Sequence, residues 1–124
     1  MREIMRPRQF RRGISVLVSV LTLCGAGSNS AMASQSGAGT ITGVYVMETG
    51  IVLFHHHGSR SALPACGTPN PIRWAFDGAT PAGQAKLALL LTAHSSQKPV
   101  VVHGTGTCTA WGDTETIQFI STAD

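Results

Sequence analysis

The stretch TITGVYVMETGIVLFHHH, Thr40 to His57, decides the fold class. Its two halves, residues 40–47 and 51–57, are rich in the β-branched and aromatic residues that favour strands. Glu48-Thr49-Gly50 between them has the composition of a tight turn, so the stretch predicts an antiparallel hairpin. We therefore expect a mainly β domain built around this hairpin.

The chain beyond the hairpin alternates between loops and further regular elements. Residues 58–71 carry three prolines and two glycines and predict a loop, followed by a third strand over 72–76. A helix is expected from Pro81 to about His94, because Thr80 suits the N-cap position and proline suits the first helical position. Its apolar positions cover more than one face, so we expect it to be largely buried.

The last part of the chain predicts two more strands. They are expected over 100–103 (VVVH) and 115–121 (ETIQFIS), with a Gly/Thr-rich loop over 104–112 between them. The resulting order, β-β-β-α-β-β, is the connectivity of a five-stranded OB barrel, which also removes exposed strand edges. An open antiparallel sheet with one packed helix is the alternative.

The start of the chain has the layout of a cleavable signal peptide. A head containing Arg2 to Arg12 precedes an apolar run over 13–24, too short to span a bilayer core that needs roughly 20 residues. Ala31-Met32-Ala33 then offers small residues at the two positions that a signal peptidase reads, so we place the cut between Ala33 and Ser34. This predicts a signal peptide over 1–33, a flexible leader over 34–39 and a single small domain over 40–124.

The predicted cut changes the net charge of the remaining chain and implies where the protein is located. The whole chain carries a net charge of +3, but most of its basic residues precede the cut, leaving about −1. No Lys/Arg cluster remains to neutralise several phosphates, so nucleic-acid binding is not expected. We expect a secreted or periplasmic protein without a membrane anchor, since Leu23 occupies a position where a lipoprotein signal ending at Cys24 needs a small residue.

Two cysteines follow the predicted cut. Cys66 and Cys108 lie 42 positions apart in a domain destined for an oxidising compartment, where thiols pair. We expect one disulfide between them.

Several segments together resemble a known family of small secreted bacterial OB-fold proteins related to toxin B subunits. The resemblance is carried by Ile41 to Phe54, Cys66, Arg73 to Phe76, Lys86 to Ala93 and the GTGTC stretch, Gly104 to Cys108. It implies a glycan- or protein-binding subunit that forms a homo-oligomeric ring and has no catalytic activity of its own.

Three residues are candidates for contacting such a ligand. Trp111 lies in the Gly/Thr-rich loop, where an exposed indole can stack on a sugar ring while Asp113 bonds its hydroxyls. Tyr45, in the first strand, is the third candidate. The alternative for Trp111 is a lid folded over the disulfide, whereas Trp74 alternates with Phe76 and is expected in the core.

The histidines suggest a second kind of site. His55 and His57 share one face of a strand while His56 points to the other, and His103 comes from another strand. Together His55, His57 and His103 are candidate ligands for zinc or copper. The alternative is a polar strand end leading into the loop.

No catalytic motif is found, and an enzyme is not expected. Asp113 and Glu115 are two positions apart, an arrangement usual for solvated surface acids. Three functions remain: a binding subunit, a periplasmic metal-binding protein using the histidine-bearing strand, or an uncharacterised secreted structural or interaction protein.

Overall fold

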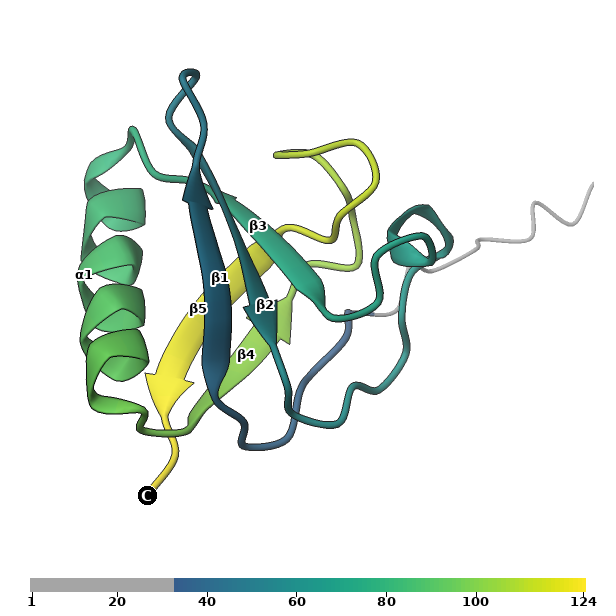
Figure 1. Ribbon diagram of the computed structural model, residues 1–124. Helices are drawn as coiled ribbons and strands as arrows, with labels where there is room; N and C mark the ends of the chain where they lie inside the picture. The colour runs from purple at the N-terminus through teal and green to yellow at the C-terminus, as the bar shows by residue number, and fades with distance from the viewer. Residues whose placement is uncertain (1–32) are drawn as a thin grey trace, which may run out of the picture.

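The computed structural model describes residues 33–124 (Figure 1). The signal peptide prediction falls almost wholly on residues 1–32, outside the described residues, and stays a prediction. The elements follow the expected order: β1 (Ile41–Val46), β2 (Ile51–His56), the short 3-10 helix η1 (Ala65–Gly67), β3 (Arg73–Asp77), α1 (Pro81–Ser96), β4 (Val100–Gly104) and β5 (Ile117–Thr122). The prediction of a mainly β protein with one helix is confirmed.

The strands form two antiparallel sheets. Strands β1, β2 and β3 make a three-stranded sheet, and β4 and β5 make a two-stranded one. The two sheets are linked by isolated single-residue bridges, such as the parallel bridge between Ala75 and Thr116, not by continuous ladders. The predicted five-stranded closed barrel is therefore not confirmed.

A β-bulge at Gly43 decides which side chains of β1 face outward. Thr42 pairs with His55 and Val44 with Phe54, so Gly43 is an extra residue in β1. Its φ of +57° is a conformation that glycine adopts without strain. Because one extra residue offsets the alternation of side chains, the bulge brings Tyr45 to the same outer face as Thr42.

The core lies between the inner faces of the two sheets and α1. Trp74 is 1% exposed, which confirms its predicted place in the core. The buried cluster comprises Ile41, Val52, Phe54, Trp74, Phe76, Leu90, Ala93, Val100, Val102, Ile117 and Ile120.

Helix α1 begins as predicted but is less buried than expected. The Thr80 side chain accepts a hydrogen bond from the Gly83 amide at 3.0 Å, and the helix ends at Ser96, followed by the C-cap residue Gln97 in the left-handed conformation. Only Gly83, Leu90 and Ala93 are buried, and Leu91 is 46% exposed. The prediction of a largely buried helix is wrong, because α1 packs with one side against the strands and leaves the other side, rich in alanine, to solvent (Figure 1).

The segment 34–39, expected to be a flexible leader, is part of the fold. It runs antiparallel to β4: Ser36 N donates to the Val102 carbonyl at 2.8 Å, and Gly39 N donates to the Val100 carbonyl at 3.0 Å. Ser34 and Ser36 are each only 2% exposed. The composition did not predict this pairing. Small polar residues give no hydrophobic pattern, but their backbone groups can still form hydrogen bonds with the edge of a strand.

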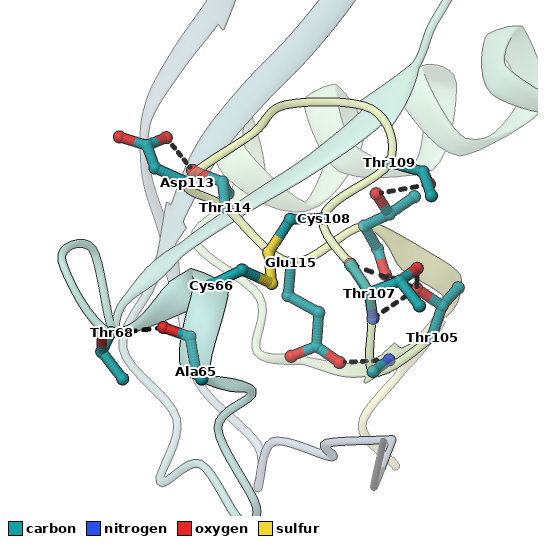
Figure 2. Close-up of a disulfide and its surroundings, with 12 residues drawn as sticks. Ala65, Cys66, Thr68, Thr105, Thr107, Cys108, Thr109, Asp113, Thr114 and Glu115 are labelled. Atoms are coloured by element: carbon teal, nitrogen blue, oxygen red, sulfur yellow. Dashed lines mark hydrogen bonds between the residues drawn. A yellow bond between two sulfur atoms is a disulfide. The ribbon is translucent and has the colours of Figure 1, made fainter. Parts of the chain in front are cut away.

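The predicted disulfide between Cys66 and Cys108 is present. It joins the loop before β3 to the loop between β4 and β5 (Figure 2). The described residues contain no helix long and apolar enough to cross a membrane.

Reduction of this disulfide is expected to lower the free energy of unfolding by about 4 kcal/mol, because the unfolded chain regains the entropy of a loop of about 40 residues. Urea unfolding with and without reductant measures the difference. A Cys66→Ala/Cys108→Ala double variant is the control, since reductant should not move its midpoint. An unchanged midpoint for the unaltered protein would contradict the expectation.

Candidate functional site

An open hollow of about 380 Å³ lies on the outer face of the three-stranded sheet. Its position follows from the strand register. Tyr45 pairs with Leu53 across β1 and β2, and His55 pairs with Arg73 across β2 and β3, so these four side chains share one face. The lining residues are Tyr45, Met47, Leu53, His55, Arg73 and Trp111.

Two of the three predicted ligand contacts, Tyr45 and Trp111, meet at this hollow. Tyr45 is 50% exposed and stands edge-on to the His55 ring, with the ring centroids 5.7 Å apart. Trp111 comes from the loop between β4 and β5, which folds back on itself through a hydrogen bond from Thr114 N to the Trp111 carbonyl at 3.0 Å. The site therefore combines two aromatic side chains from segments far apart in the sequence.

Asp113, the third predicted contact, does not line the hollow but holds Arg73. Its Oδ1 accepts from Arg73 Nη2 at 2.5 Å, and its Oδ2 accepts from Asn70 Nδ2 at 3.0 Å. Arg73 Nε also donates to Thr114 Oγ1 at 2.8 Å. These contacts orient a guanidinium group beside the two aromatic rings.

The Arg73 contacts also set the ionisation of Asp113. Partial desolvation raises the pKa of the Asp113 carboxyl, but hydrogen bonds from Arg73 and Thr114 and the charge of Arg73 outweigh it, so the pKa lies below its ordinary value. Asp113 is therefore ionised at neutral pH and keeps Arg73 paired.

Arg73, His55 and Met47 also line the hollow, and the sequence patterns did not identify them as candidate ligand contacts. Arg73 directly precedes the core residue Trp74 on β3 and so faces the opposite side of the sheet. That alternation was visible in the sequence. The position of Met47 in the lining was not visible in the sequence, because it depends on where the end of the hairpin lies relative to Trp111.

The structure does not bring the three candidate metal ligands together. His55 faces the hollow. His57 is exposed, and its Nε2 lies 2.7 Å from Thr42 Oγ1. His103 belongs to the other sheet, where its ring stacks on that of Phe119 with the ring centroids 4.1 Å apart. Within residues 33–124, no group of three or more His, Cys, Asp or Glu side chains is placed to hold a metal ion. The histidines share a sequence pattern without sharing a site.

His56 has a structural role on the opposite face, as the alternation predicted. It is 1% exposed, its Nε2 donates to the Val100 carbonyl at 2.9 Å, and its Nδ1 accepts from Gly58 N at 3.2 Å. Burial lowers the pKa of His56 despite the hydrogen bonds that favour its charged form. A neutral ring with one donor and one acceptor suits both partners.

Glu115, expected on the solvated surface, is fully buried. It forms an ion pair with Arg60, whose guanidinium lies 3.6 Å above the Trp74 ring centroid. Gly106 N donates to its Oε1 at 2.7 Å, and the carboxylate lies near the disulfide (Figure 2). The expectation failed because the loop that carries Glu115 turns inward toward a cation 55 positions earlier in the chain.

Comparisons of this chain with protein-family models, with curated proteins and with solved structures found no match.

Replacing Arg73 with Met is expected to raise the pKa of the Asp113 carboxyl toward its ordinary value of about 3.9, because the stabilising donors are lost. A carboxyl whose folded pKa is depressed stabilises the fold above that ordinary value, and the contribution disappears as the pH falls through the folded pKa. A ¹³C carboxyl NMR titration measures the shift. Lys86→Met, on α1, is the control and should leave the Asp113 titration unchanged; an equal titration in both variants would count against the Arg73 contact.

Proposed function

We propose that this protein is an exported, non-catalytic binding protein whose ligand is a glycan held in the hollow on the outer face of the three-stranded sheet. The observation that carries the proposal is the meeting of Tyr45, Trp111 and Arg73 around one open hollow. As the resemblance to toxin B subunits implies, the protein acts as a binding subunit and forms a homo-oligomer.

The chemistry of the lining suits a sugar. A pyranose ring has apolar C–H faces that pack on aromatic rings, and its hydroxyl groups need donors and acceptors at the edge. Tyr45 and Trp111 supply rigid amphipathic surfaces at a small entropic cost. Arg73 supplies hydrogen-bond donors whose direction is set by Asp113.

We also propose that the five strands form an OB-like barrel, and the bridges between the strands support this. Besides the Ala75–Thr116 bridge between the two sheets, Gly39 pairs with Val100 and Gln35 with His103, so the chain before β1 runs along β4. The order would then be β1, β2, β3, β5, β4 and back to the start of the domain. OB folds bind oligosaccharides and oligonucleotides on the face of strands 2 and 3, between the loops after strands 1 and 4. In such a barrel the hollow, lined by residues from β1, β2, β3 and the loop after β4, would occupy this position.

The charges favour a glycan over a nucleic acid. The described part of the chain has four Lys and Arg residues: Arg60, Arg73, Lys86 and Lys98. Arg60 pairs with buried Glu115, and Arg73 pairs with Asp113. Since both cations near the sheet are already neutralised, the face lacks the unpaired positive charge that phosphate backbones require.

The proposal is tested on a glycan array, followed by calorimetric titration of any glycan that binds. Trp111→Ala and Tyr45→Ala should each weaken binding about tenfold or more, equivalent to about 1.4 kcal/mol, because each removes one stacking surface. Phe119→Ala is the matched control: this aromatic side chain is 45% exposed but belongs to the other sheet, and its loss should leave the affinity unchanged.

The absence of any glycan ligand on the array, combined with a monomeric mass by native mass spectrometry, would overturn the proposal. If glycan binding is unchanged in both Trp111→Ala and Tyr45→Ala, the glycan site does not lie in this hollow and the proposed location is wrong.

A further inference from the structure

The buried carboxylate of Glu115 collects donors from distant parts of the chain. Its Oε1 accepts from Gly106 N at 2.7 Å and from Ser34 N at 3.2 Å. Its Oε2 accepts from the Ser34 hydroxyl and from Arg60 Nη2. The ligand hollow uses none of these contacts, so the cluster requires a separate explanation.

Ser34 marks a sharp boundary in exposure. Ala33 is exposed, whereas Ser34 is 2% exposed and pairs with β4 through a hydrogen bond from Gly104 N to the Ser34 carbonyl at 2.7 Å. Within residues 33–124, burial therefore begins at the residue that follows the predicted signal-peptidase cut. The amide nitrogen that the cut would release is the one that faces Glu115.

We propose that Glu115 is the binding site for the α-ammonium group of Ser34, created when the signal peptide is removed. Hydrolysis of the Ala33–Ser34 bond by a signal peptidase consumes one water: the Ala33 carboxylate leaves with the signal peptide, and the Ser34 amine takes up a proton. The single N–H donor of the peptide becomes a cation with three donors beside a buried anion. Processing thus adds a charged contact that the precursor lacks.

The charges around this nitrogen favour the contact. Glu115 Oε1 accepts from the Ser34 nitrogen, Glu115 Oε2 accepts from the Ser34 hydroxyl, and Arg60 Nε donates to that hydroxyl at 3.2 Å, so the carboxylate lies closer to the nitrogen than the guanidinium does. Removal of the exposed Ala33 leaves the ammonium open to water on one side, so it keeps part of its hydration. A partly hydrated ammonium can therefore bind the carboxylate without the full cost of burying a second cation next to Arg60.

The contact gives stability a defined pH dependence. A carboxylate partner raises the pKa of an α-amino group above its unfolded value of about 7.7–8.0. A group whose folded pKa is raised stabilises the fold below the unfolded value, and that contribution is lost as the pH rises through the folded pKa. The advantage of a free Ser34 terminus should therefore be complete near pH 6 and absent in strongly alkaline solution.

The test compares two purified forms of the protein, one beginning at Ser34 and one with Ala33 retained, which displaces the ammonium by one residue. At pH 6 the form with Ala33 should melt about 4–8 °C lower, the shift expected for one lost contact in a domain of this size. Glu115→Gln should abolish the difference between the two forms. Glu48→Gln, in the hairpin turn, is the matched control and should preserve it.

A second measurement does not require a variant to fold. NMR titration or competitive labelling of the Ser34 α-amine in the unaltered mature protein should give a pKa above that of the same amine in the unfolded chain. An equal or lower pKa, equal melting temperatures for the two forms, or an exported protein whose first residue is not Ser34 would overturn the proposal. The proposal rests on the predicted cut and is independent of glycan binding, so either can fail without the other.

Discussion

The structure depends on one buried carboxylate. Glu115 is held by donors from the start of the domain, from the loop before β3 and from the loop between β4 and β5. Its ion pair partner Arg60 lies over Trp74, the largest fully buried side chain. An uncompensated charge in this position would be costly, so these segments have to assemble together. The disulfide from Cys66 to Cys108 reinforces the same region with a covalent link.

This anchored end of the molecule supports the loop that carries the candidate ligand site. Trp111 and Asp113 lie between Cys108 and Glu115, so both ends of their short segment are fixed, one by the disulfide and one by burial. Strands β1 to β3 supply the other wall, with Tyr45, His55 and Arg73 on one face. The hollow therefore combines a hydrogen-bonded sheet with a short tethered loop, an arrangement that would limit the entropy lost on binding the proposed ligand.

Much of the fold could be read from local sequence patterns. The hairpin, the order of the elements, the Thr80 cap, the core position of Trp74 and the pairing of Cys66 with Cys108 all follow from short-range signals or from composition. Of the residues that line the hollow, Tyr45 and Trp111 were candidate ligand contacts from the sequence, whereas Arg73 and His55 were not placed beside them. The three candidate metal ligands were identified from residue type and strand alternation, but the structure places His55 in β2, His57 after the end of that strand and His103 in β4 of the other sheet.

The sequence by itself determined the secondary structure, because strand alternation, turn composition and helix capping act over a few residues. Only the tertiary structure decided that 34–39 belongs to the fold, that α1 keeps an exposed side and that Glu115 is buried. Each of these depends on a partner far away in the chain, such as β4 for Ser36 or Arg60 for Glu115. The pairing of a polar residue with a distant partner leaves no periodic pattern, whereas the burial of an apolar face does.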